Sequence, residues 1–531
     1  MSALTGTGSL VRLALRRDRV LLPVWILIFA ATAASSASAT VGLYPTIESR
    51  VRAAETINAT PSLVALYGLI YDPTSLGAVA MLKLGGIVAA LVAVLAVLTV
   101  VRHTRGEEEA GRLELLGATV VSRYAALTAA LLVAFGASLV IGVLTAAGLI
   151  SAGLPTAGSV AFGLAWAGVG IAFAAVAAVS AQLTQSARSA TALSIVVLGF
   201  VYLLRAIGDT AGAHGPRWLS WLSPVGWGQQ IRPYAGERWW VLLLLAGFAA
   251  VLAAGAFGLV ARRDLGAGLL PDRPGPASAA AGLRSPFALA WRLHRGAVLG
   301  WTAGFTVLGA VLGNIASSVG NLLDSPQARE MVLRLGGEKG LTDAFLAAEL
   351  GIVGVIASVF GVQAAMRLRA EETASHAEMV LATSVGRFRW AFSHLTVALF
   401  GTAALLVGAG LGAGLAHGAQ LGDLGQVGPV LLGALVQLPA TWVVAAIVVA
   451  LFGLAPRLIV GGWAALVAFL LIGEFGPLLR LDQWVMDLSP FAHLPKIPGA
   501  QFSAAPILWL TVTAAALIAA GLVGLRHRDI G

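Results

Sequence analysis

Apolar runs of about 20 residues recur along the whole chain, and they constrain its fold more than any other feature. One such run can cross the hydrocarbon core of a bilayer, about 30 Å thick, as a single α-helix. Of the 531 residues, 58% are apolar and 11% are Asp, Glu, Lys or Arg, whereas soluble domains carry about 25% charged residues. A few buried helices in a soluble protein would need far more polar sequence around them. The sequence therefore predicts a polytopic membrane protein.

Each apolar run is expected to be helical, because a helix satisfies its own backbone hydrogen bonds in lipid. A transmembrane β-barrel would instead show weak alternation in short strands. The hydropathy pattern thus predicts an all-α fold with twelve spans in two sets of six. The predicted spans are 20–39, 79–101, 124–152, 158–182, 190–207, 239–261, 296–316, 350–366, 391–416, 427–453, 458–473 and 504–525.

A stretch rich in Pro and Gly, residues 264–285, separates the two sets of spans. It predicts a cytoplasmic linker between a first half, residues 1–263, and a second half, residues 286–531. If both termini are cytoplasmic, about two thirds of the 34 Lys and Arg residues fall on the inner side, which agrees with the positive-inside rule. We therefore expect both termini in the cytoplasm.

The first apolar run has two possible interpretations, a cleavable signal peptide and an uncleaved span. Arg16, Arg17 and Arg19 precede it, and it ends in Ala37-Ser38-Ala39, which mimics a cleavable signal peptide. A similar basic flank recurs before a later span, so the sequence favours an uncleaved first span.

A charged segment occurs once in each half, after the second span. Residues 105–119 read RGEEEAGRLELLGAT, and residues 369–383 read RAEETASHAEMVLAT. Neither contains Pro, so we expect short helices near 106–118 and 370–382. The matched pairs are Arg105 with Arg369, Glu107 with Glu371, Glu108 with Glu372, Glu114 with Glu378, Arg123 with Arg387, Leu222-Ser223-Pro224 with Leu488-Ser489-Pro490, and Arg263-Asp264 with Arg528-Asp529. This match predicts two parallel repeats.

The chemistry of the charged segment favours docking. In a helix, Glu107 and Glu114 share a face, and Glu108 can pair with Arg112 at i,i+4. We expect these acids to face the cytoplasm. An interfacial helix is the simpler alternative, but helices that bind anionic lipid are usually basic. A duplicated acidic segment instead suits a cytoplasmic partner with a basic cleft.

Several kinds of site are excluded by the residues that the sequence lacks. There is no Cys, which excludes disulfides and thiolate metal sites. No GxxxxGK[ST] phosphate-binding loop occurs, so any ATP must be bound by another chain. The eight His residues show no metal-ligand spacing, and no Ser/His/Asp arrangement stands out. We expect no metal, no catalytic residue and no nucleic-acid partner.

Two further features have open interpretations. Residues 214–240 are rich in Trp and predict an interfacial helix or a re-entrant turn, either a plain anchor or an outer gate. The candidate gate residues are Trp218, Trp221, Ser223, Pro224, Trp227, Ser489 and Pro490. Lys83 and Glu349, near the outer starts of two spans, are either a pair across the halves or side chains that reach the interface separately.

The pattern R-x-E-E-x-x-x-R/H-x-E-x-x-x-A-T, with a basic residue before the next span, resembles the coupling segment of type-2 ATP-binding cassette (ABC) exporter permeases. The whole chain resembles their fused twelve-span actinobacterial subgroup, described as exporters of polyketide antibiotics of the tetronasin and daunorubicin kind. The resemblance implies a bacterial plasma membrane and a separate cytoplasmic ATPase, in two copies, that binds ATP and Mg. It implies that Glu107, Glu108, Arg112 and Glu114 contact one ATPase copy, and that Glu371, Glu372 and Glu378 contact the other. Thr373 and His376 depart from the first copy, which puts equal coupling in doubt.

The resemblance implies a permease subunit that exports a hydrophobic or amphiphilic, drug-like small molecule and has no ATPase site of its own. A proton- or sodium-coupled multidrug antiporter is the alternative, but its usual G-x-x-x-D-R/K-x-G-R/K-R/K loop is absent after the second span. A membrane scaffold or a lipid-modifying enzyme is a third interpretation, which no catalytic cluster supports.

Overall fold

The computed structural model describes residues 4–117, 119–211, 215–264, 266–270, 277–280, 282–319, 337–475 and 482–528. Within these residues the chain forms helices and no strands, which confirms the predicted all-α fold. It divides into two compact units, Met1–Gly275 and Pro276–Gly531, and the division falls within the predicted linker.

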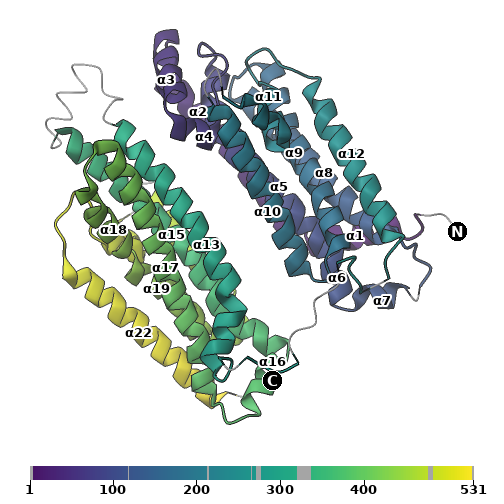
Figure 1. Cartoon of the computed structure of the whole chain (residues 1–531), viewed down its shortest axis with the longest axis vertical. Coiled ribbons are helices and arrows are strands. Elements are labelled where there is room, and N and C mark those ends of the chain that lie inside the picture. Colours follow the sequence, from purple (N-terminus) through teal and green to yellow (C-terminus); the bar gives the residue numbers. More distant parts are fainter. Residues whose placement is uncertain are drawn as a thin grey trace. The chain divides into compact units, whose positions relative to one another are not determined.

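In the first unit, long helices pack around one central helix, α9, whose Trp166 and Phe173 are fully buried (Figure 1). Close approach is possible because α9 is rich in Gly and Ala. A Cβ atom on Gly163 would lie 2.2 Å from the carbonyl oxygen of Gly142 in α8. The elements are α1 (Thr7–Arg17), α2 (Leu21–Leu43), α3 (Ile47–Ala59), α4 (Pro61–Tyr67), α5 (Leu76–His103), α6 (Arg105–Glu109), α7 (Arg112–Gly117), α8 (Ala125–Ser151), α9 (Thr156–Leu183), α10 (Ala187–Thr210), η1 (Arg217–Leu222), α11 (Pro224–Gln230) and α12 (Val241–Val260).

The second unit uses the same packing principle. A Cβ atom on Gly309 or on Gly313 of α13 would lie 2.1 Å from a carbonyl oxygen of α17. The elements are α13 (Pro286–Val319), α15 (Gly337–Thr373), α16 (His376–Leu381), α17 (Arg387–Leu421), η3 (Leu424–Gln426), α18 (Val427–Leu435), α19 (Leu438–Leu454), η4 (Pro456–Leu458), α20 (Gly461–Phe475), α21 (Gln483–Met486), η5 (Pro490–His493) and α22 (Ala504–His527).

The described part of the chain contains 11 helices that are long and apolar enough to cross a membrane. The predicted eleventh span, 458–473, coincides with a shorter apolar helix, Gly461–Gly473. This helix starts late because the 3₁₀ turn Pro456–Leu458 precedes it. The structure therefore confirms a polytopic helical protein, while the full number of twelve spans stays a prediction.

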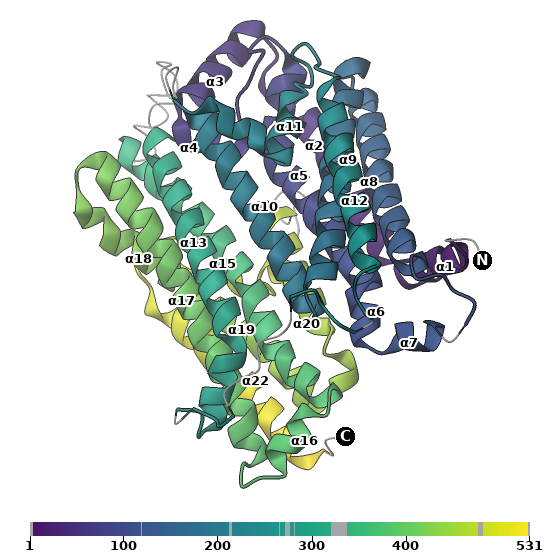
Figure 2. The ribbon, with the colours of Figure 1, turned by 45° about the vertical axis from the view of Figure 1, so that its right-hand side comes forward.

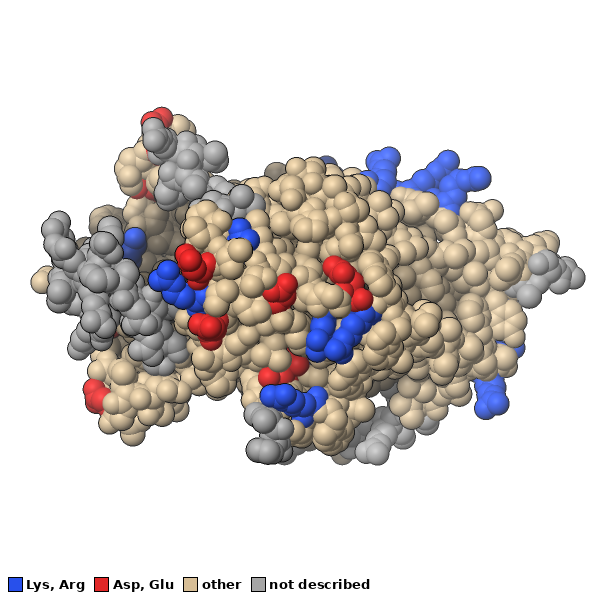
Figure 3. All heavy atoms as spheres, turned by 90° about the horizontal axis from the view of Figure 1, so that it is seen from above, with Lys and Arg blue, Asp and Glu red and all other residues tan. Residues whose placement is uncertain are grey.

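The two ends of each unit differ. Figures 1 and 2 show α3, α4 and α11 at one end of the first unit and α6 and α7 at the other. In the second unit, α16 follows the last turn of α15. It therefore lies at the end of the unit away from the first turn of α15. We call the ends with α6, α7 and α16 the charged ends, and the opposite ends the far ends. The face in Figure 3, seen from above Figure 1, is mostly uncharged, with small mixed groups of acids and bases.

Candidate functional site

The acid-rich segment of each unit is two short helical pieces rather than one helix. In the first unit, α6 is followed by Gly111, whose φ is 70°, before α7 begins. In the second unit, α15 is followed by Ser375, whose φ is 57°, before α16 begins. A residue in the left-handed region typically ends a helix. The prediction of one continuous helix near 106–118 and near 370–382 is therefore wrong, although the break falls at matched positions.

Glu108 lies in a cluster of arginines and is only 7% exposed. Arg263 donates to both of its carboxylate oxygens, at 2.6 and 2.9 Å, and the backbone N–H of Gly266 donates at 2.6 Å. Arg105 is its third partner, at 3.2 Å. The predicted Glu108–Arg112 pair is wrong, because the helix breaks between these two residues.

Arg105 is 1% exposed and connects several elements. Its Nε donates to the carbonyl oxygen of Ala181 in the last turn of α9, at 2.9 Å, and its Nη atoms donate to that of Ala267. A buried guanidinium keeps its charge only when it is paired and hydrogen-bonded. These bonds and Glu108 together meet that requirement.

Glu107 is buried beside Glu108 but has its own partners. Arg17 from the end of α1 donates at 2.5 Å, and Arg112 donates at 2.8 and 2.9 Å. The hydrogen bond to Glu107 raises the pKa of Arg112, so this exposed guanidinium stays charged. Glu107 therefore fastens both the N-terminal helix and the start of α7 to α6.

The second unit repeats this arrangement with some substitutions. Glu371 pairs with Arg367 at 2.7 Å and contacts Nδ1 of His376 at 3.4 Å. Glu372 pairs with Arg369 at 3.0 Å and with Arg528 at 2.9 Å. Both acids are buried.

The expectation that all of the acids face the cytoplasm is therefore wrong for Glu107, Glu108, Glu371 and Glu372. Arginines at the ends of the spans form ion pairs with these four acids. This pairing offsets the free-energy cost of burying their charges. Glu114 on α7 and Glu378 on α16 are exposed, as predicted.

Sequence reasoning missed the role of Arg263 and Arg528, although it matched the two Arg-Asp sequences that contain them. Each follows the last helix of its unit and binds the second acid of the pair. The matched basic residues Arg123 and Arg387 donate nearby, to the carbonyl oxygens of Ala261 and Arg528. Cations commonly bind the unsatisfied carbonyls at helix C-termini.

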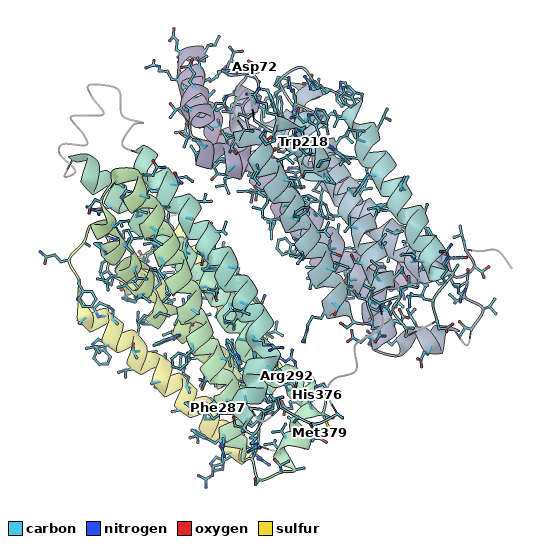
Figure 4. The ribbon with its side chains drawn as sticks, viewed as in Figure 1. Asp72, Trp218, Phe287, Arg292, His376 and Met379 are labelled. Atoms are coloured by element: carbon cyan, nitrogen blue, oxygen red, sulfur yellow. The ribbon has the colours of Figure 1, made fainter. Side chains whose placement is uncertain are left out.

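Each charged end presents a short exposed helix beside its buried acid pair. In the first unit, α7 exposes Arg112 and Glu114. In the second, α16 exposes His376, Glu378 and Met379, the last with 66% of its surface accessible. Figure 4 shows His376 and Met379 at this end of the unit, near the first turns of α13, where Phe287 and Arg292 lie. We call these exposed faces of α7 and α16 the docking faces, after the docking role that the sequence predicts for them.

The candidate gate residues form compact elements at the far end. Ser223 caps α11 by accepting a hydrogen bond from the N–H of Gly226, and Pro224 begins the helix. Trp221 stacks on Trp240 with ring centres 5.7 Å apart, and Trp227 Nε1 donates to the carbonyl oxygen of Trp221. Trp218 is exposed (Figure 4).

In the second unit, Ser489 precedes η5, which begins at Pro490. The described residues form short helices here, and both the interfacial anchor and the outer gate stay predictions.

A buried arginine at the far end was not predicted. Arg205 of α10 is 0% exposed and lies 3.5 Å from Asp209. It also donates to the carbonyl oxygens of Ala65 and Leu66 in α4 and to Oε1 of Gln229 in α11. Asp209 in turn accepts from the hydroxyl of Ser220 in η1. The sequence did contain a sign of this buried pair, because an Arg and an Asp four residues apart interrupt an otherwise apolar run.

The remaining predicted contacts concern metals and the intramembrane pair. Within the described residues, no group of three His, Cys, Asp or Glu side chains is placed to hold a metal ion. Lys83 is exposed on α5 and Glu349 is partly buried on α15. Their pairing across the halves stays a prediction.

Comparison with known proteins assigns the chain to a family. A family model described as the C-terminal domain of the multidrug efflux system permease Rv1217c matches residues 8–263 and 283–526. The multidrug efflux system permease protein Rv1217c of Mycobacterium tuberculosis (strain ATCC 25618 / H37Rv) is 48% identical over 532 residues, which cover 100% of this chain and 96% of the relative. Both matches include α6, α7 and α16 at the charged ends and the helices at the far ends. The chain therefore belongs to the family of multidrug efflux system permeases.

Proposed function

We propose that this chain is the permease subunit of an ABC exporter, in which a separate cytoplasmic ATPase drives the efflux of a hydrophobic or amphiphilic small molecule. The observation that carries this proposal is the duplicated charged end. Each unit places a buried acid pair, an arginine from beyond its last helix and an exposed short helix together. Two docking faces, one in each unit, suit two copies of one partner.

The buried acids give each docking face a firm connection to the spans. In the first unit, Glu108 and Arg105 tie α6 to the end of α9 and to the segment that follows α12. Glu109 accepts from the N–H of Ala187 at the start of α10. In the second unit, Glu372 and Arg387 both bind the end of α22. A displacement of α7 or α16 is thereby passed to several membrane helices rather than absorbed by a loose loop.

We assign the predicted coupling residues two roles, which the burial of some and the exposure of others support. Glu107, Glu108, Glu371 and Glu372 hold the docking faces in place and do not themselves contact the ATPase. Glu114 and Arg112 contact one ATPase copy, while Glu378, His376 and Met379 contact the other. The two faces differ in charge and in apolar surface, so the two ATPase copies are held with unequal strength.

The ATPase supplies the ATP and Mg site, and the permease supplies the path for the cargo. The termini, the linker and the docking faces lie in the cytoplasm, and the far ends face outward, in a bacterial plasma membrane. The spans offer Ala, Leu, Val, Phe and Trp but few charges. They therefore suit an antibiotic or another drug-like molecule without a strong net charge, in keeping with a role in multidrug resistance.

The test is the composition of the complex purified in mild detergent from its native membrane. The wild type should have the mass of one permease with two copies of a P-loop ATPase. Glu114→Lys combined with Glu378→Lys should lose the ATPase, because both docking faces then repel a basic cleft. Glu48→Lys combined with Glu55→Lys is the matched control, since it makes the same charge change on exposed acids of α3 at the far end.

A permease without any partner in several mild detergents would contradict the proposal. Transport driven by a proton gradient in proteoliposomes would then be the next measurement, because the antiporter predicts it. Equal loss of the ATPase in the control variant would show that the docking faces are not specific.

A further inference from the structure

The second unit contains a large cavity at its far end, with a volume of about 830 Å³. Its walls are the first turns of α15, the end of α20 and the segment that contains α21 and η5. The lining is mostly apolar and includes Phe469, Met486 and Phe491. Drug-sized ligands bind in pockets of about 300–1,000 Å³ that are mostly apolar and carry a few polar groups. The size and lining of this cavity fit that description.

The first unit has a cavity at the matched place, but its volume is only about 60 Å³. Counted from Ser223 and Ser489, Gln229 corresponds to Pro495. Gln229 donates to the carbonyl oxygen of Tyr67 at 2.8 Å and so draws α11 against the end of α4. Proline has no side-chain donor and cannot make this bond.

A second tether of the first unit is also replaced. Arg232 lies over the ring of Tyr71, 4.2 Å from its centre, and Pro498 takes the corresponding place in the second unit. The second unit therefore lacks both of these side-chain tethers, and its cavity is the larger of the two.

One buried polar atom in the wall of the large cavity lacks a partner. Ser489 is 0% exposed, and its Oγ has no hydrogen-bond partner among the described residues. The matched Ser223 accepts from the N–H of Gly226. A buried hydroxyl without a partner is costly and rare. A ligand with a hydrogen-bonding group would satisfy it.

We propose that this cavity binds the exported molecule and that its ligand is an uncharged amphiphile with at least one hydrogen-bonding group. The inference rests on the efflux function proposed above, because it names where the cargo binds. Among the described residues, the cavity lining contains one carboxylate, Asp343, and one ammonium group, Lys496, and these two charges balance. Gln437, which is buried, and Ser489 supply the polar contacts.

The experiment measures the binding of radiolabelled chloramphenicol, an uncharged amphiphile, to the full-length permease in lipid nanodiscs without any ATPase. Gly351→Phe places a ring in the cavity, because Gly351 lines it and a Cβ atom there meets nothing within 4 Å. Gly428→Phe on α18 is the matched control, since it also meets nothing within 4 Å and lies outside the cavity lining.

We expect Gly351→Phe to weaken chloramphenicol binding by about tenfold or more, because the ring takes the ligand's volume, and Gly428→Phe to leave it unchanged. Ser489→Ala should weaken binding about fivefold, the loss expected for one hydrogen bond. Gel filtration of each variant checks that it remains folded. If Gly351→Phe does not fold, the chloramphenicol binding of Ser489→Ala alone tests the proposal.

Three results would overturn the proposal: no binding by the wild type, equal binding by the two Phe variants, or unchanged binding by Ser489→Ala. The assay contains no ATPase, so its outcome is independent of the co-purification test. A wild-type permease that purifies without any ATPase but still binds chloramphenicol would reject ATP-driven export alone.

Discussion

At the scale of single residues, the carboxylate of Glu108 organises the charged end of the first unit. It compensates two arginines and also accepts a backbone N–H. Glu108→Gln should therefore lower the free energy of unfolding by about 3 kcal/mol, because breaking a buried pair leaves a charge uncompensated. The midpoint of thermal unfolding in detergent measures the effect. Glu114→Gln, at an exposed site of the same segment, should leave the midpoint unchanged, and equal midpoints would refute the assignment.

A second residue of this kind is Arg205 at the far end. Arg205→Leu leaves Asp209 buried without its cation, so we expect a loss of stability of about 3–5 kcal/mol. Combining it with Asp209→Asn should restore part of that loss, since no buried charge then remains. Unfolding of the purified variants in denaturant gives the comparison. A double variant less stable than the single one would show that Asp209 does not depend on Arg205.

At the scale of elements, the break within each charged segment depends on one left-handed residue. Gly111 adopts this conformation without strain, whereas Ser375 adopts it with a side chain. Ser375→Gly should therefore stabilise the second unit, and Gly111→Ser should destabilise the first, each by about 1 kcal/mol. A Cβ atom on Gly111 would meet nothing within 4 Å. The change in stability therefore comes from the backbone conformation and not from a steric clash of the new side chain. Thermal unfolding of both variants tests it, and the same sign of change in the two variants would contradict it.

The same break explains which part of the site the sequence could predict. The absence of Pro indicated a helix, and the i,i+4 rule then paired Glu108 with Arg112. That rule applies only to a continuous helix, and Ser375 gives no sign in the sequence that it will adopt a positive φ. The actual partner of Glu108 is Arg263, 155 residues away. A contact of that range depends on how the last helix packs, which local pattern does not specify.

At the scale of the whole molecule, hydropathy was enough to predict the helical membrane fold, because each span must bury a long apolar surface in lipid. At the eleventh span the helix begins at Gly461, after the 3₁₀ turn Pro456–Leu458, and apolar composition alone does not reveal this later start. The large cavity also escaped prediction, since it forms between α15, α20 and the segment that contains α21 and η5, and local pattern does not specify how these elements pack. Composition thus fixes what is buried in the membrane, while tertiary contacts fix the sites.

The orientation of the molecule leads to one further prediction, which the absence of cysteine makes simple to test. The positive-inside rule predicts that both charged ends lie in the cytoplasm. Single cysteines introduced as Glu114→Cys and Glu378→Cys should react with a membrane-impermeant maleimide only after the cells are lysed. Thr74→Cys and Ser503→Cys, exposed just before α5 and α22, should react in intact cells. The reverse pattern would place the docking faces outside and remove any access for a cytoplasmic ATPase. A mixed pattern, with the two docking faces on opposite sides, would contradict the parallel arrangement of the two halves.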